Sequence, residues 1–416
     1  MARCPRMHKC GCAPVVEAPV DLHSGGAVTY AGIDIGKDKH WLAIVDGAGG
    51  IVMKGRPFTA DFEGHEALVH TLQKHEVELA ALEATGHYWK NLFARLVGET
   101  AVALVDPSQT HHFAAQDGRR AKTDAIDALG IARFCAVHRP PPSALPDLAI
   151  ESLRELVRLR DRLVQDKGDR LRQLHRALDL AFTEFTSVVT IDSRLAWSLL
   201  RAFPTAQAFD KAKQNQISAL IFDGRHRVGK KRAVALKRAA RKSIGAHQTA
   251  VWAMQIRMYA EDLELFWERI RALDEQIESH LDDHDIGRLI TTIDGVGVQA
   301  AAHILAAAGD PRDYDSAKTF AAYAGITPRT NHSGRRTPRR APICRKGSAE
   351  LRKKLWMPTL TAMHRNPRMS AFAERLQSRG KPHKVIRIAC VRKLLTAVYS
   401  VAKSGRPFVP LLPSET

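Results

Sequence analysis

Alternating apolar and polar positions in the first third of the chain predict strands separated by amphipathic helices. The run VTYAGIDIG alternates and ends in glycine, and HWLAIVD and IVMKGRPF follow it after short turns. Such alternation is typical of half-buried strands, whereas apolar residues recurring at threes and fours indicate helices. The predicted strands are 28–36, 40–46, 51–58, 77–84 and 101–106, with Pro107 stopping the last, and the predicted helices are 60–74, 87–97 and 123–138.

This order of elements predicts a mixed α/β sheet. Two later stretches, 148–180 and 251–283, place apolar residues at helical spacing between many charges. They predict two long amphipathic helices that pack as an antiparallel pair or coiled coil, with dimer formation favoured over an ordinary core-facing role. The predicted domains are an irregular extension (1–27), an α/β domain (28–140) ending near RPPP, a helical region (141–283) and a mainly helical C-terminal domain (284–416).

Positive charge dominates the chain beyond its first third. Lysine and arginine number 63 against 44 acids, a formal net charge of +19. Residues 225–242 carry nine lysines and arginines and no acid. A basic body favours a polyanion partner, nucleic acid above all, over a merely solvated surface. The residues predicted to contact nucleic acid in this segment are Lys230, Lys231, Arg232, Lys237 and Arg238.

Other compositional signals exclude several classes of protein. No run of 18 apolar residues is present, so no membrane span is predicted. The first residues have charge but lack the apolar core of a secretory signal. Six cysteines in 416 residues do not make a disulfide scaffold. A cytoplasmic protein is therefore expected.

Four carboxylates of the α/β domain stand out by their placement. Asp34 lies on the first strand, Glu83 ends the fourth, and Asp124 and Asp127 open a helix three residues apart. Each alone could cap a turn or a helix. Together they can converge on one sheet edge, where like charges repel unless a cation lies among them. Hard oxygen ligands suit Mg²⁺ or Mn²⁺, and two such ions can clamp a phosphodiester.

The segments GIDIGKDKH, LEATGHYW, VDPSQTHHFA and KTDAIDA resemble the DEDD-type transposases of the insertion-sequence 110 group, which includes Piv-like DNA invertases. The resemblance extends from about Thr29 to about Lys403. It implies a RuvC-like RNase H fold for the first domain. It also implies that the catalytic, metal-binding acids are Asp34, Glu83, Asp124 and Asp127.

A second family signature lies near the C-terminus, in AGITPRTNHSGRRTPRRAPICRKGSAELRKKL. The resemblance implies that Ser333 is the catalytic nucleophile. Arginines beside it would stabilise charge on a pentavalent phosphate. The alternative is a Ser-Gly turn in a DNA-binding loop. The chain departs from its relatives at Gly334-Arg335 and at Ile343-Cys344-Arg345. The basic residues predicted to contact nucleic acid here are Arg335, Arg336, Arg339, Arg340, Arg345 and Lys346.

Residues 289–309 resemble a helix–hairpin–helix around DGVGV, which could bind a phosphate or simply pack two helices. For the whole chain, the resemblance implies a transposase that cuts and rejoins donor and target DNA by Mg²⁺-dependent transesterification. It further implies a structured guide RNA and a homo-oligomer, a dimer or tetramer. Two alternatives stay open: a junction-resolving nuclease that activates water, and a non-catalytic nucleic-acid scaffold.

Overall fold

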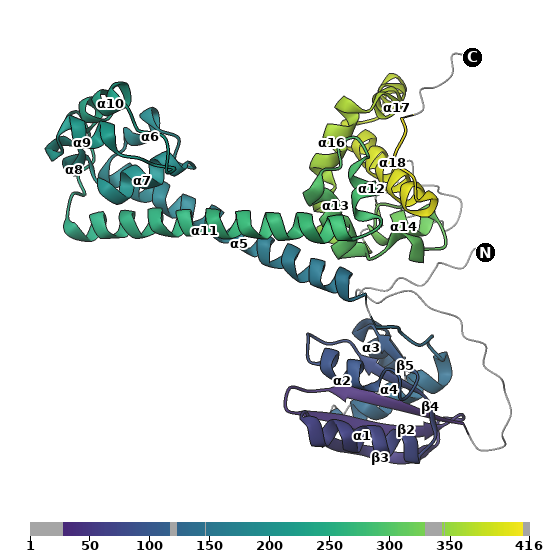
Figure 1. The fold of residues 1–416 in the computed structure, drawn as a ribbon. Helices are drawn as coiled ribbons and strands as arrows, with labels where there is room; N and C mark the ends of the chain where they lie inside the picture. Colours follow the sequence, from purple (N-terminus) through teal and green to yellow (C-terminus); the bar gives the residue numbers. More distant parts are fainter. Residues whose placement is uncertain (1–27, 117–122, 146, 329–342, 345, 411–416) are drawn as a thin grey trace. The chain divides into compact units, whose positions relative to one another are not determined.

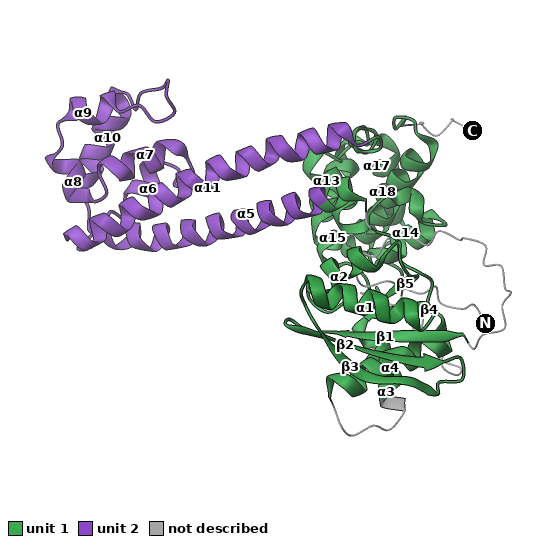
Figure 2. Ribbon diagram, turned by 60° about the horizontal axis from the view of Figure 1, so that its bottom comes forward, with its two compact units in different colours: residues 1–151, 285–416 green, residues 152–284 purple. Residues whose placement is uncertain are grey.

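The computed structural model describes residues 28–116, 123–145, 147–328, 343–344 and 346–410. The chain divides into two compact units (Figure 2). One comprises residues 1–151 together with 285–416, and the other comprises residues 152–284. Among the described helices, none is long and apolar enough to cross a membrane.

A five-stranded mixed sheet forms the core of the N-terminal region (Figure 1). Its order is β3-β2-β1-β4-β5. The first three strands form an antiparallel meander, and β1, β4 and β5 run parallel. The prediction of a mixed α/β sheet is confirmed. The strands are β1 (Thr29–Ile35), β2 (Lys39–Asp46), β3 (Ile51–Thr59), β4 (Val77–Glu83) and β5 (Val102–Val105).

Helices cover both faces of this sheet. Leucines and phenylalanines of α1 and α2 pack with Ile33 and Leu82 on one face. On the other face α4 packs with Tyr30 and Ala81. The helices are α1 (Phe62–Lys74), α2 (Trp89–Leu96), α3 (Pro107–Gln116) and α4 (Asp124–His138).

Helix α3 was absent from the sequence prediction, which treated Pro107 only as the end of a strand. Asp106 instead begins the helix: its carboxylate accepts a hydrogen bond from the backbone N–H of Ser108 at 2.8 Å. Proline suits the first helical position because the backbone N–H that it lacks would have no partner there. The same proline thus both stops β5 and starts α3.

Two 34-residue helices, α5 (Leu148–Ala181) and α11 (Ala250–Asp283), run antiparallel in the helical region (Figure 1). Two ion pairs fix their register. Arg160 bonds Asp274 at 2.5 Å, and ten residues further along α5 Arg170 bonds Asp262 at 3.0 Å. The predicted antiparallel pair is confirmed; a coiled coil between subunits stays a prediction.

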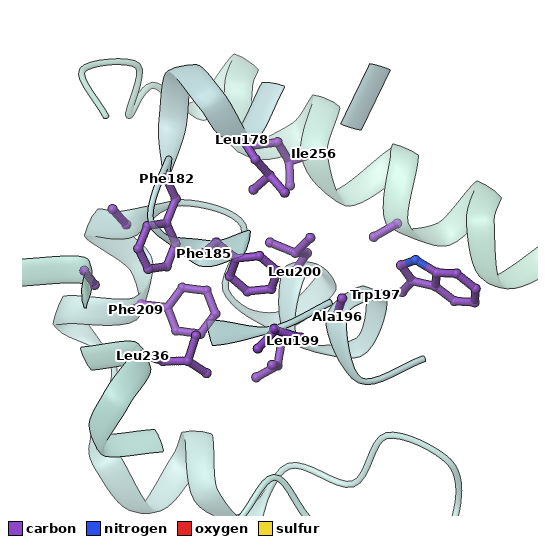
Figure 3. Packing of buried hydrophobic residues seen from close by; sticks show 14 of the residues in the cluster. Leu178, Phe182, Phe185, Ala196, Trp197, Leu199, Leu200, Phe209, Leu236 and Ile256 are labelled. Atoms are coloured by element: carbon purple, nitrogen blue, oxygen red, sulfur yellow. The ribbon is translucent and has the colours of Figure 1, made fainter. Parts of the chain in front are cut away.

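A cluster of aromatic and aliphatic side chains packs the C-terminal end of α5 and the N-terminal half of α11 against five short helices (Figure 3). Phe182, Phe185 and Phe209 are fully buried, with ring centroids 5.3–6.0 Å apart. Burying three large rings supplies a core independent of the sheet. The short helices are α6 (Phe185–Val188), α7 (Arg194–Ala202), α8 (Ala206–Lys211), α9 (Gln214–Ala219) and α10 (Lys230–Arg241).

The C-terminal region is helical, as predicted. The hairpin glycine Gly295 has a φ of +89°, and a Cβ there would lie 2.5 Å from the backbone nitrogen of Ala362. Close packing on α16 therefore explains this glycine. The elements are α12 (Gly287–Thr291), α13 (Val298–Ala308), the 3₁₀ turn η1 (Pro311–Asp313), α14 (Ala317–Tyr323), α15 (Ala349–Lys354), α16 (Trp356–Arg365), α17 (Pro367–Ser378) and α18 (His383–Ser404).

Candidate active site

Two of the four predicted acids lie at the carboxyl edge of neighbouring parallel strands. Ile33 of β1 pairs with Leu82 of β4, so Asp34 and Glu83 are the next residue on each strand. Successive side chains of a strand point to opposite faces. Because Ile33 and Leu82 pack in the core with α1 and α2, Asp34 and Glu83 project from the face that α4 covers.

Helix α4 supplies the other two acids from its first turn. Thr123 caps this helix: its hydroxyl accepts a hydrogen bond from the N–H of Ile126 at 3.3 Å. Asp124 and Asp127 follow three residues apart, a spacing that places both on one side of the helix. The sequence-predicted acids therefore come from three elements, β1, β4 and α4.

Gly32 lets α4 approach the sheet this closely. A Cβ at this position would lie 2.0 Å from the backbone nitrogen of Ala132 and 2.3 Å from the carbonyl oxygen of Ala128. Only glycine leaves room for that contact. Since Gly32 precedes Asp34 by two residues and Asp127 adjoins Ala128, the contact brings two of the acids together.

The charges of the other three carboxylates act on Asp34. The pKa of Asp34 is raised from 3.8 to about 6, first by burial and then by the negative charges of Asp127, Asp124 and Glu83. Half-buried Trp41 pairs with Asp34 across β1 and β2. We call Asp34, Glu83, Asp124 and Asp127 the acid cluster.

Hydroxyl groups hold the carboxylate of Glu83 in place. Thr110 of α3, a buried residue, donates to Oε2 at 2.8 Å, and Thr85 donates to Oε1 at 3.0 Å. Thr110 was not among the predicted site residues, because α3 was not predicted. The signal that could have found it is Asp106-Pro107, a cap followed by proline at the first helical position.

The donor set of the acid cluster suits a hard divalent cation, since it consists of carboxylate oxygens. Within the described residues, however, no three His, Cys, Asp or Glu side chains are already gathered as metal ligands would be. The cluster is thus a set of coupled carboxylates, and closing it around a cation would require side-chain movement.

The basic segment of the helical region forms α10, which turns one face to its core and another outward. Ala233, Leu236 and Ala240 are buried. Lys237 forms hydrogen bonds within the protein. Its ammonium donates to the carbonyl oxygen of Asp210 at 2.7 Å and to that of Ala212, and both acceptors lie at the C-terminal end of α8. The predicted contact residues that stay exposed are Lys230, Lys231, Arg232 and Arg238.

Most of the second predicted site lies outside the described residues. This applies to Ser333, Arg335, Arg336, Arg339, Arg340 and Arg345. Lys346 is described and exposed. Next to the gap, Pro328 and Ile343 form an antiparallel bridge, and the N–H of Cys344 donates to the carbonyl of Thr327 at 2.8 Å.

Two family models match this chain. Residues 31–183 match a model described as a transposase of the DEDD type found in IS110, and residues 287–374 match one described as the transposase IS116/IS110/IS902 family. These matches identify the α/β domain with its acid cluster, and the basic helical body joined to it, as parts of a DNA transposase or recombinase. The chain belongs to the IS110 family of transposases.

Curated relatives agree along nearly the whole length. The pilin gene-inverting protein of Moraxella bovis is 27% identical over 392 residues, which span 91% of this chain and 97% of the relative. The uncharacterised 42 kDa protein of insertion element IS900 from Mycobacterium paratuberculosis is 27% identical over 401 residues, 92% and 97% of the two chains. The uncharacterised 44.8 kDa protein of insertion element IS116 from Streptomyces clavuligerus is 25% identical over 405 residues, again 92% and 97%.

Proposed function

We propose that this transposase cuts and rejoins DNA by metal-dependent transesterification, using the acid cluster and Ser333. The proposal includes a RuvC-like RNase H fold for residues 28–140. The observation that carries it is the gathering of four carboxylates near the carboxyl edge of the sheet, where burial and then the negative charges of the other three raise the pKa of Asp34 to about 6. Four coupled acids on a half-buried edge are costly for the fold and useful to a cation-dependent enzyme.

The acid cluster fits Mg²⁺ or Mn²⁺ by its chemistry. Its members are oxygen donors, and a divalent cation would relieve the repulsion that Asp34 experiences. When bound, the cation would supply positive charge to a phosphate in its pentavalent transition state. The residues of the chain contribute orientation: Thr110 and Thr85 hold Glu83, and the cap at Thr123 fixes the start of α4.

Ser333 would act as the nucleophile. Its Oγ forms a bond to the scissile phosphorus, the bond from phosphorus to the 3′-oxygen breaks, and the leaving 3′-oxygen takes up a proton. The DNA end is then held as a phosphoserine ester. A 3′-hydroxyl that attacks this ester rejoins the strands and returns the serine, so no bond energy is lost to water.

The proposed partners are donor and target DNA, a structured guide RNA and further copies of the chain. The net charge of +19 and the exposed basic face of α10 support contact with phosphate backbones. The guide RNA and the oligomer, a dimer or tetramer, rest on the resemblance to the family.

The test is a search for a covalent intermediate. Full-length protein is incubated with Mg²⁺, element-end DNA and the RNA encoded by the element's non-coding end, then denatured, and protein-bound DNA is measured. The proposal predicts an adduct that disappears in Ser333→Ala. Ser378→Ala is the matched control, because the Ser378 hydroxyl donates to the backbone carbonyl of Arg375 at 3.0 Å, and its loss should leave the adduct intact.

The outcomes separate the remaining candidates. Free cut ends that survive Ser333→Ala would replace the proposal with a nuclease that activates water at the acid cluster. Intact DNA under all conditions that support binding would favour a non-catalytic scaffold. In either case Ser333 would have no catalytic role.

A further inference from the structure

The aromatic rings of His87 and Tyr88 are exposed on the loop that follows Glu83 of the acid cluster. Residues 85–88 are all exposed, and Tyr88 shows 42% of its surface to solvent. Its ring lies 4.2 Å from the ring of His87, centroid to centroid. Among the described tryptophan, tyrosine and phenylalanine side chains, only Tyr88 and Phe62 are this exposed. Exposing such a ring costs stability that burial would have supplied.

The loop is built to hold these rings outward. Gly86 has a φ of +61°, which turns the chain, and its carbonyl accepts a hydrogen bond from the indole N–H of Trp89 at 3.2 Å. Trp89 packs edge-on against Phe93, which is 1% exposed. Because Trp89 anchors the start of α2, the two residues before it remain on the surface.

The same loop is tied to the acid cluster. It begins directly after Glu83, and the hydroxyl of Thr85 donates to the Glu83 carboxylate at 3.0 Å. Five residues of extended chain reach at most about 18 Å, so Tyr88 lies within a few nucleotides of any phosphate held at the cluster.

An exposed ring pair beside a phosphodiester site suits a nucleobase, since every base offers a flat π-face. Inside a duplex both faces of a base are covered by its neighbours, so stacking requires an unpaired, terminal or splayed base. We propose that Tyr88, with His87, forms a stacking platform for an unpaired nucleobase next to the acid cluster. The inference deepens the proposed function: the cluster would receive a locally melted strand rather than an intact helix.

The test measures binding of the full-length protein in EDTA, so that no cleavage occurs. The probes are a labelled single-stranded oligonucleotide containing 2-aminopurine and a blunt duplex of the same sequence. Tyr88→Ala should weaken single-strand binding about tenfold, a typical loss for one stacked base, and leave duplex binding unchanged. Tyr88→Trp should retain binding. Quenching of 2-aminopurine by the wild-type protein should disappear in Tyr88→Ala.

Phe62→Ala is the matched control, because it removes a 78% exposed ring at the start of α1, which follows the edge strand β3, whereas Tyr88 follows β4, the parallel neighbour of β1. Equal losses for both variants, equal losses on single strand and duplex, or a Tyr88→Trp protein as weak as Tyr88→Ala would overturn the proposal. So would wild-type protein that binds no single strand. Because the assay contains EDTA and measures binding alone, it does not depend on the serine chemistry, so failure of the stacking platform and failure of that chemistry remain distinguishable.

Discussion

Replacing Gly32 with alanine should separate α4 from the sheet and disable the acid cluster. The new Cβ would lie 2.0 Å from the backbone nitrogen of Ala132, whereas ordinary contacts begin at 3.4 Å. The obstacle is backbone on both sides, so no side-chain rotation can relieve it. Helix α4 must move by about 1.4 Å, the difference between these two distances, and it carries Asp124 and Asp127 with it.

The expected loss of stability is about 3 kcal/mol or more, the upper end of the usual cost of overpacking, because backbone has to shift. For an α/β domain of the length of residues 28–140, with an unfolding entropy of about 2.1 cal/mol/K per residue, that lowers the melting temperature by roughly 13 °C. Calorimetric scans of the full-length protein should show it in the transition assigned to the sheet domain. Titration with Mn²⁺ should show weakened binding even at temperatures where the variant is folded.

Gly168→Ala is the matched control, the same substitution in the middle of α5. There the nearest neighbour of a new Cβ is the Arg172 guanidinium at 3.7 Å, an ordinary contact. Alanine in a helix interior should stabilise by about 0.5–1 kcal/mol. If Gly32→Ala melts at the wild-type temperature and binds Mn²⁺ with the wild-type affinity, the close contact between α4 and β1 does not position the acids.

Three further changes test the site and the two cores. The folded state binds a proton at Asp34 more tightly than the unfolded chain does, so the free energy of unfolding falls as the pH rises from 3.8 to about 6. Asp34→Asn should therefore raise the metal-free melting temperature at pH 7.5 and abolish stabilisation by Mn²⁺. Burial, then neighbouring His65, lowers the pKa of His40 from 6.5 to about 4. The free energy of unfolding should therefore fall as the pH drops between these values, by up to about 1.4 kcal/mol per pH unit. His40→Leu should reduce this pH dependence. Phe185→Ala should cost about 3–5 kcal/mol in the helical region while Mn²⁺ binding at the sheet stays normal in titrations.

The sequence predicted the sheet because each strand carried its own signal. Alternation in the first strand and short apolar runs in the others identified all five strands, and the register of β1 with β4 then placed Asp34 beside Glu83 as expected. The cap at Thr123 likewise located the helix that carries the other two acids. These features depend on local pattern, which a single sequence displays.

What the sequence did not reveal depends on contacts between distant segments. Thr110 matters because it reaches Glu83, 27 residues earlier, from a helix whose proline was interpreted only as a strand end. Lys237 stood among the predicted nucleic-acid contacts, yet its ammonium serves the carbonyl end of α8. Nothing in the local sequence distinguishes Gly32 from any other small residue of a strand, because its role comes from the backbone of α4 that lies against it. No periodicity records such tertiary partners.

The acid cluster is difficult to explain as a purely structural feature. Other carboxylates in the described parts of the chain have a basic partner, as Asp223 has in His226 and Asp310 in Arg312. Asp34 instead lies at a half-buried strand end, where burial and then three further carboxylates raise its pKa. A fold optimised for stability alone would place apolar or neutral groups there, because each ionised acid opposes the others. The close contact at Gly32 holds this unfavourable arrangement in place, and a divalent cation that bridges the acids would turn the repulsion into binding energy.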